Sequence, residues 1–122
     1  MNILNYASLE ASKRLVEAGI VLETDFYHVE HHAGGYYQQA IVPKIELLTI
    51  PKDDIVEINP APSMAEVWRE LLKKHNVSLS GQQEGLTTAW TYAGGQETSP
   101  DIPNTNPTDA LIDLLIWVKE KP

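Results

Sequence analysis

The chain has 122 residues and no cysteine, which excludes disulfides, thiolate nucleophiles, zinc–thiolate sites and iron–sulfur clusters. This length suits a single domain, residues 1–122, with one hydrophobic core. Nine Lys and Arg against seventeen Asp and Glu give a net charge of −8, which repels phosphate backbones and anionic lipids, so we expect neither nucleic acid nor a membrane as a partner.

The first residues carry no pattern that is typical of a secretion signal. Residues 1–6 lack a basic patch, and the following segment mixes Glu10 and Lys13 with apolar side chains. The longest apolar run, residues 110–118, is interrupted by Asp113 and has about half the length needed to span a bilayer. We therefore expect a cytoplasmic protein.

The first helix is predicted over residues 7–18, where Leu9 and Val16 stand one heptad apart. Further apolar side chains fall on the same side of this helix: Ala11, Leu15 and Ala18. Gly19 is expected to end the helix because glycine adopts the left-handed conformation readily, with Ile20 folding back on the last turn as in a Schellman cap.

A β-hairpin is predicted next, because the pattern from Phe26 onward has a period of two. One face would carry Tyr27, Val29 and His31, and the other Phe26, His28, Glu30 and His32. Residues 33–35 supply a flexible turn, and residues 36–42 form the returning strand, which Pro43 ends.

Two more strands are predicted at residues 45–50 and 55–58, separated by a turn at residues 51–54. Residues 59–62 contain two prolines, each of which biases the preceding residue toward an extended conformation. This segment is therefore expected to be a short rigid connector.

The second helix is predicted to begin after Ser63. Its side chain and that of Glu66 form a capping box, in which each satisfies a backbone donor at the helix start. Apolar residues and one histidine recur with helical spacing: Met64, Val67, Trp68, Leu71, Leu72 and His75. The charged residues fall on the opposite side, so one face should pack on the core.

A second hairpin follows, with Val77 and Leu79 in its first arm, a turn at residues 81–85 and residues 86–92 in its second arm. Residues 94–105 are polar and contain prolines. A structureless segment of this length is uncommon in a compact domain, and we expect a mobile surface loop.

The third helix is predicted to start with Asn106 as N-cap, Pro107 at the first helical position and Asp109 in the first turn. Apolar residues cover most of its circumference and leave a narrow polar stripe: Asp109, Asp113 and Glu120. Such a helix needs burial on more than one side.

These elements together predict an α+β fold in one domain. Hairpin-length connections favour antiparallel pairing, so we expect a mostly antiparallel sheet with the three helices packed against it. The order of the strands in the sheet is left open.

Three helical stretches resemble, in their order, small uncharacterised proteins of bacterial phage and prophage gene sets: ASKRLVEAGI at residues 11–20, PAPSMAEVWREL at residues 60–71 and NPTDAL at residues 106–111. The resemblance covers well under half of the chain and consists of caps and core positions. It implies a phage accessory protein and transfers no catalytic or binding residue.

Three side chains of the first hairpin could form a metal site. His28, Glu30 and His32 share one strand face, with about 6.6 Å between successive positions. Imidazole and carboxylate suit zinc, iron or manganese and could leave positions open for water or a substrate. Alternatively, these residues form the solvent side of the hairpin, with Tyr27 and Val29 on its packed side.

No motif predicts a catalytic residue or a cofactor-binding loop. The serines lack the glycine pattern of a nucleophile elbow. The paired glycines do not lead into a helix with the Gly-Lys-Ser/Thr ending that binds nucleotides.

Aromatic residues supply the candidates for partner binding. Trp117 lies near the polar stripe of the third helix, and Tyr36 and Tyr37 belong to the first hairpin. Tryptophan and tyrosine are enriched in interface hot spots. The leading hypothesis is a non-enzymatic phage or prophage accessory protein that binds another protein, itself forming a homodimer.

The apolar third helix supports that hypothesis, because it could bury a second side against another chain. The competing hypothesis is a protein that binds zinc or another divalent metal, or a small metal-dependent hydrolase. It would use His28, Glu30 and His32 as ligands.

Overall fold

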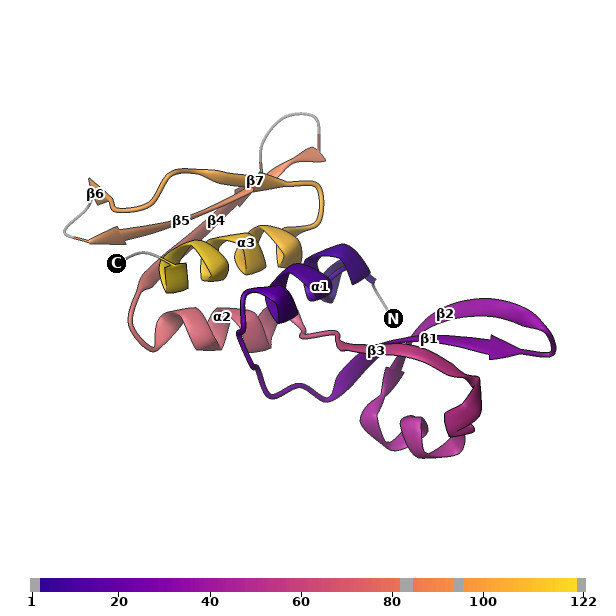
Figure 1. Cartoon of the computed structure of the whole chain (residues 1–122). Helices are drawn as coiled ribbons and strands as arrows, with labels where there is room; N and C mark the ends of the chain where they lie inside the picture. Colours follow the sequence, from indigo (N-terminus) through magenta and orange to yellow (C-terminus); the bar gives the residue numbers. More distant parts are fainter. Residues whose placement is uncertain (1–2, 82–84, 94–95, 121–122) are drawn as a thin grey trace.

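The computed structural model describes residues 3–81, 85–93 and 96–120 (Figure 1). The α-helices are α1 (Leu9–Glu17), α2 (Met64–Leu72) and α3 (Pro107–Glu120). The strands are β1 (Phe26–Ala33), β2 (Tyr36–Pro43), β3 (Ile55–Pro60), β4 (Asn76–Gly81), β5 (Thr87–Ala93), β6 (Gln96–Glu97) and β7 (Ile102–Asn104). Short 3-10 helices complete the set: η1 (Ile3–Asn5), η2 (Lys44–Thr49) and η3 (Lys52–Asp54).

The strands form two antiparallel sheets. In the first sheet β1 lies between β2 and β3. In the second sheet β5 pairs with β4, β6 and β7. The predicted α+β class and its antiparallel hairpins are confirmed, and the strands are divided between two sheets.

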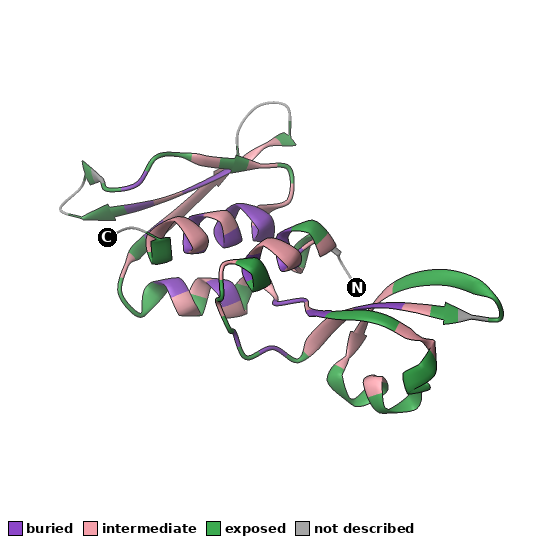
Figure 2. Ribbon diagram, in the orientation of Figure 1, coloured by how far each residue is buried: buried purple, intermediate pink, exposed green. Residues whose placement is uncertain are grey.

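The first sheet projects from the rest of the chain together with η2 and η3 (Figure 1). We call residues 26–60 the lobe and the other described residues the body. The principal hydrophobic core lies in the body and includes no residue of the lobe. Figure 2 shows the same division, with much exposed surface on the lobe and buried residues concentrated where the helices meet.

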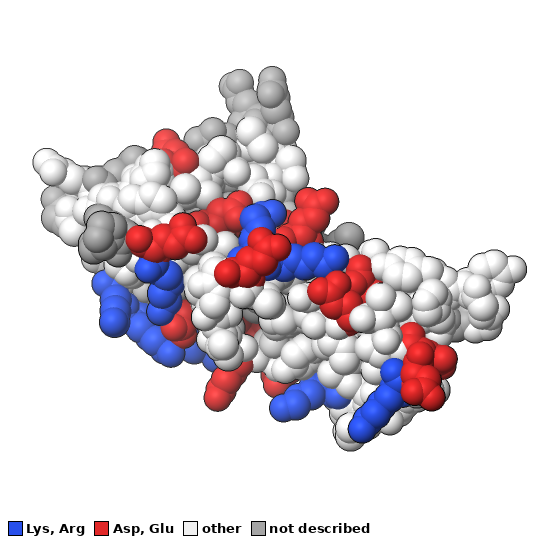
Figure 3. Space-filling view, in the orientation of Figure 1, with Lys and Arg blue, Asp and Glu red and all other residues white. Residues whose placement is uncertain are grey.

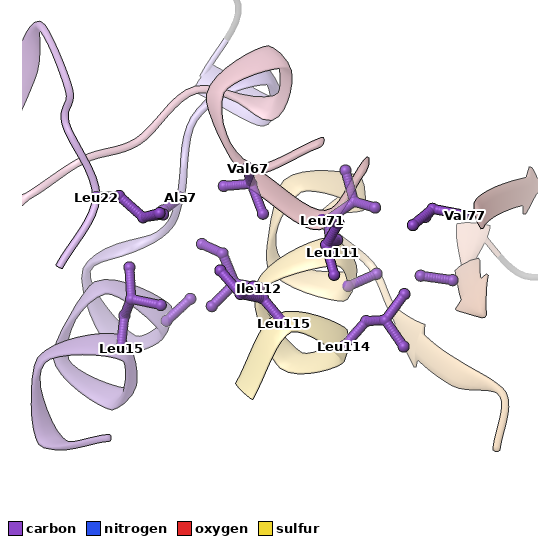
Figure 4. Close-up of a cluster of buried hydrophobic side chains, with 13 residues drawn as sticks. Ala7, Leu15, Leu22, Val67, Leu71, Val77, Leu111, Ile112, Leu114 and Leu115 are labelled. Carbon is purple, nitrogen blue, oxygen red and sulfur yellow. The ribbon is translucent and has the colours of Figure 1, made fainter. Parts of the chain in front are cut away.

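Helix α3 lies at the centre of the body and packs against α1, α2 and the second sheet. Its buried apolar residues are Ala110, Leu111, Ile112, Leu114 and Leu115. Figure 4 shows Leu15 of α1, Val67 of α2 and Val77 of β4 around these side chains. The apolar surface of α3 is therefore covered largely by other elements of the same chain. No helix of the described residues has the length and apolarity to cross a membrane.

Among the described residues of the lobe, one apolar side chain is buried. Val29, at the middle of β1, is fully buried and pairs with Ala40 of β2 and Ile58 of β3. Helices η2 and η3 contact β2 and β1, and α1 contacts β3. The first sheet is therefore held between short helical segments of the lobe and a helix of the body.

The C-terminal end of α1 forms the predicted Schellman cap. Gly19 has a positive φ of 74°, and its backbone N donates to Val16 O. The backbone N of Ile20 donates to Leu15 O. These are the two hydrogen bonds that define the motif.

The N-terminal caps of α2 and α3 are also confirmed. Ser63 Oγ accepts from the backbone N of Glu66, and Glu66 Oε1 accepts from the backbone N of Ser63. Asn106 Oδ1 accepts from the backbone N of Thr108 and of Asp109. Each cap satisfies donors that have no partner inside the helix.

Two residues predicted to pack on the core are exposed instead, Val16 of α1 and Leu72 of α2. The packed stripes are narrower than their apolar patterns suggest. In α1 the buried residues are Ala11, Ser12 and Leu15, and in α2 they are Val67 and Leu71.

The strand predicted at residues 45–50 is wrong, because residues 44–49 form the 3-10 helix η2. The backbone N of Ile50 donates to Leu47 O, and the hydroxyl of Thr49 donates to Glu46 O. Both donors find an acceptor three residues earlier in the chain rather than on a neighbouring strand. A short apolar run does not distinguish these two outcomes.

The mobile loop predicted at residues 94–105 is also wrong for the part that the structure describes. Strands β6 and β7 both pair with β5 in this segment. Between them Ser99 is buried, and its Oγ accepts from the backbone N of Thr91 at 2.8 Å. Gly94 and Gly95 lie outside the described residues.

Candidate functional site

The three predicted metal ligands share one face of β1 but meet different surroundings. His28 is half-buried, and its Nε2 donates to the carbonyl oxygen of Ala7 at 2.6 Å. Burial lowers the pKa of His28, while the hydrogen bond to Ala7 opposes this shift. His32 is exposed, with its ring centroid 6.1 Å from that of Tyr37.

Glu30 is buried and belongs to a network that joins the lobe to the body. Its Oε1 accepts from the hydroxyl of Tyr37 at 2.7 Å and lies 3.6 Å from Lys13 Nζ. Lys13 Nζ also lies 3.4 Å from Glu57 Oε2 on β3. This face of the sheet meets α1, so the expectation that it is the solvent side is wrong for His28 and Glu30.

The same contacts determine the electrostatics of the network. The hydroxyl of Tyr37 is the main reason that the pKa of Glu30 lies below its usual value, and the same bond raises the pKa of Tyr37. Desolvation alone would lower the pKa of Lys13. The carboxylates of Glu30 and Glu57 have the larger combined effect, so the pKa of Lys13 is raised. The neutral-pH state is thus a charged ammonium facing carboxylates across the lobe–body junction.

The structure does not bring the predicted ligands together as a metal cluster. Within residues 3–81, 85–93 and 96–120, no group of three or more His, Cys, Asp or Glu side chains could hold a metal ion. His28 and Glu30 are both engaged in hydrogen bonds. Metal binding through His28, Glu30 and His32 stays a prediction from the sequence.

The three aromatic residues predicted to bind a partner do not form one surface. Tyr36 and Tyr37 are 75% and 50% exposed and lie at the tip of the β1–β2 hairpin. Trp117 is half-buried in the last turns of α3. Figure 1 shows the hairpin tip and the C-terminal end of α3 at opposite ends of the molecule.

Exposed apolar side chains gather on the lobe. Ile45 and Leu48 of η2 are 75% and 87% exposed, and Val56 and Ile58 of β3 are also exposed. Figure 3 shows the β1–β2 hairpin as a largely uncharged part of the visible surface. We call the set the apolar residues of the lobe: Tyr36, Tyr37, Ile45, Leu48, Val56 and Ile58.

The sequence identified only the two tyrosines of this set. The sequence predicts a strand for Ile45 and Leu48, in which alternate residues would be covered. Their exposure follows from the 3-10 conformation of η2, which turns both side chains outward. The only signal in the sequence is the pair of prolines, Pro43 and Pro51, that brackets this segment.

Comparison with family models, curated proteins and solved structures gives no match to the chain. Two features of the lobe are left to be interpreted from their own geometry. One is the set of exposed apolar residues. The other is the outer edge of β2, which among the described residues pairs with β1 alone.

Proposed function

We propose that the chain is a non-enzymatic phage or prophage accessory protein that acts in the cytoplasm by binding another protein. Ile45 and Leu48 of η2, the two most exposed aliphatic residues of the lobe, form the centre of the proposed binding surface. The observation that carries the proposal is their exposure on a part of the chain that contributes nothing to the principal core.

The energetics of burial support this assignment. Covering a leucine or isoleucine side chain stabilises a structure by about 1.5–3 kcal/mol relative to leaving it exposed. Scattered single exposures are ordinary, whereas apolar side chains gathered on one region are typical of interaction sites. Leu48 and Ile45 lie one turn apart on η2, so a partner could cover both.

Two properties of the sequence agree with this proposal. The resemblance of the helical stretches to phage and prophage proteins supports an accessory role. The net charge of −8 disfavours nucleic acid and anionic lipid as partners, which leaves proteins as the favoured class.

Affinity capture with matched variants tests the proposal. Wild type, Leu48→Glu and Val21→Glu would be immobilised and exposed to lysate of the bacterium that carries the gene. Both substitutions add one negative charge at an apolar residue that is at least 87% exposed, Leu48 on the lobe and Val21 on the body. A protein that wild type and Val21→Glu retain should be lost from Leu48→Glu.

The comparison also defines failure. If every retained protein binds Leu48→Glu as well as it binds Val21→Glu, the lobe is not the binding surface. Circular dichroism of each variant shows whether the fold is intact. A milder substitution, Leu48→Ser, replaces Leu48→Glu if the charge unfolds the lobe.

A further inference from the structure

On its outer edge, the backbone of β2 has a row of N–H and C=O groups that no other described strand pairs with. Just beyond the strand, the backbone N of Lys44 donates to Asp25 O at 2.9 Å. Along an antiparallel strand, successive residues direct their backbone groups alternately toward the neighbour and away from it. Residues 42, 40, 38 and 36 therefore face β1, whereas Tyr37, Gln39 and Ile41 direct their N–H and C=O groups outward.

The turn of the hairpin gives the same alternation of inward-facing and outward-facing residues. Gly34 and Gly35 have φ values of 59° and 84°, as in a two-residue type I′ turn. Such a turn closes on a hydrogen-bonded pair, here Ala33 and Tyr36, so Tyr36 also faces β1. The two ends of the strand give the same assignment of outward-facing residues.

The outer edge of β2 has little of the usual protection against pairing, because its one proline, Pro43, is the last residue of the strand. Natural edge strands are kept apart by charged side chains, bulges, prolines or short length. β2 has eight residues in unbroken register with β1 and none of them is charged. By contrast, β3 carries Glu57 and a register shift, and β6 and β7 have two and three residues. The edge strand β4 is also uncharged, but it is shorter than β2, with six residues.

We propose that β2 pairs with β2 of a second copy of this chain, antiparallel, about a two-fold axis at Gln39. An axis perpendicular to the sheet keeps each face on its own side, so residues of the same face must stand opposite each other. Gln39 then faces Gln39 of the second copy, and Tyr37 faces its Ile41. This register uses all three outward-facing residues of each chain.

The side chains favour this register. Tyr37 stands opposite Ile41, and Tyr36 stands opposite Val42 on the other face, and aromatic residues opposite β-branched residues stabilise antiparallel sheets. A shift by one residue pair would place Tyr37 opposite Pro43, which has no N–H to donate to the Tyr37 carbonyl. No charged residue of the strand opposes another, although each chain carries a net charge of −8.

The second copy is favoured over an unrelated peptide because the strand complements itself in both its backbone groups and its side chains. A depression of about 550 Å³ adjoins Gln39 and is also lined by residues at the N-terminal ends of α1 and α3. Pairing would cover part of Tyr36 and Tyr37 and would leave Ile45 and Leu48 on η2 for the partner proposed above.

Cysteine cross-linking tests the register directly, because the chain has no cysteine of its own. In a hydrogen-bonded antiparallel pair the Cα atoms are about 5.5 Å apart, which suits a disulfide, and the Cβ atoms need to approach by only about 1 Å for the bond to form. We expect Gln39→Cys to form a disulfide-linked dimer under mild oxidation at least tenfold faster than Gln38→Cys. Gln38 is also exposed, but it would stand diagonal to its counterpart, beyond disulfide reach.

Light scattering supplies the second readout. Wild type should dimerise in the range from about 1 μM to 1 mM, the scale of weak association. Gln39→Lys should reduce or abolish the dimer because it places two like charges directly opposite each other, whereas Gln38→Lys should keep it. Circular dichroism checks that both variants are folded.

Each failure has a distinct meaning. If the wild type stays monomeric over this whole concentration range, the proposal is overturned. Finding an extended segment of another protein on the edge of β2 would not rescue it. A dimer that cross-links equally through both cysteine variants overturns the pairing of β2. Neither result affects the capture experiment at Leu48, which concerns a different surface and a different partner.

Discussion

Asp109 joins the N-terminal ends of two helices. Its Oδ1 accepts from the backbone N of Ser8 at 2.8 Å, and its own backbone N donates to Asn106 Oδ1 at the start of α3. Only 5% of the residue is exposed. A carboxylate at this position also interacts favourably with the positive end of the helix dipole.

Replacing this carboxylate should destabilise the body. We expect Asp109→Ala to lower the free energy of unfolding by about 1–3 kcal/mol, because the backbone N of Ser8 would lose its acceptor. Urea unfolding measures the change. Asp101→Ala removes an exposed carboxylate and is the control; equal midpoints for the two variants would refute the role given to Asp109.

His28 makes the stability of the fold depend on pH. Because burial lowers its pKa from 6.5 in the folded state, the unfolded chain takes up this proton at higher pH than the folded chain does. Its contribution is therefore fully present above the unfolded-state pKa. It is lost as the pH falls below that value, until the folded-state pKa is reached.

We expect His28→Gln to lose less stability than wild type between about pH 7.5 and about pH 5, values on either side of the ordinary histidine pKa. Urea unfolding at both pH values measures the difference. His32→Gln, which replaces an exposed imidazole, is the matched control. The expectation fails if the two variants show the same pH dependence.

The hydrogen bonds of His28 and Glu30 bear on the metal hypothesis. A ligand that binds only the folded state raises the melting temperature, and the rise grows with the logarithm of the ligand concentration relative to its Kd. Because both side chains are engaged, we expect added zinc to leave the melting temperature unchanged. A saturable rise at one zinc per chain that disappears in His32→Ala would contradict this and support the sequence-based alternative.

At the scale of the elements, Gly19 shows what a single left-handed residue contributes. An added Cβ would meet no atom within 4 Å, so Gly19→Ala should act through its φ of +74° alone. The left-handed conformation costs a non-glycine residue roughly 1–2 kcal/mol. We expect the free energy of unfolding to fall by that amount.

Gly81→Ala is the control for this prediction. Its added Cβ also has open space, and Gly81 does not have a positive φ. A loss of stability that is equal in Gly81→Ala and Gly19→Ala, measured by urea unfolding, would show that the cap conformation is not the cause.

Structural features that depend on residues close in the sequence could be predicted, whereas features that depend on distant residues could not. The caps at Gly19, Ser63 and Asn106 were predicted because each depends on residues a few positions apart. The strand at residues 45–50 was wrong because an apolar run of that length fits more than one local structure. The role of Asp109 was missed because its partner, Ser8, is 101 residues away along the chain.

The candidate site was predictable only in part for the same reason. Tyr36 and Tyr37 follow a glycine turn, which marks an exposed hairpin tip. The exposure of the apolar residues on η2 and of the outer edge of β2 depends on how distant elements of the described chain pack against each other. Strand order is a long-range property that the alternating pattern of a single strand does not contain.

For the molecule as a whole, we expect the lobe to open at a lower free energy than the body. The principal core excludes the lobe, and in β2 four of the eight residues are exposed and none is buried. Regions with few buried apolar contacts exchange their amide hydrogens through local openings, whereas core elements require global unfolding. Native-state hydrogen exchange should therefore give smaller opening free energies for β2 and β3 than for α3 and β5, and identical values would refute the division.

The separation of lobe and body also divides the fluorophores. Trp68, Trp90 and Trp117 all lie in the body, whereas Tyr27 and the two tyrosines of the hairpin tip lie in the lobe. Tryptophan emission therefore reports the unfolding of the body. Tyrosine absorbance and the dichroism of the strands also report the unfolding of the lobe. A denaturant titration in which these signals change at different concentrations would show a partly folded species, with an intact helical body and an open lobe.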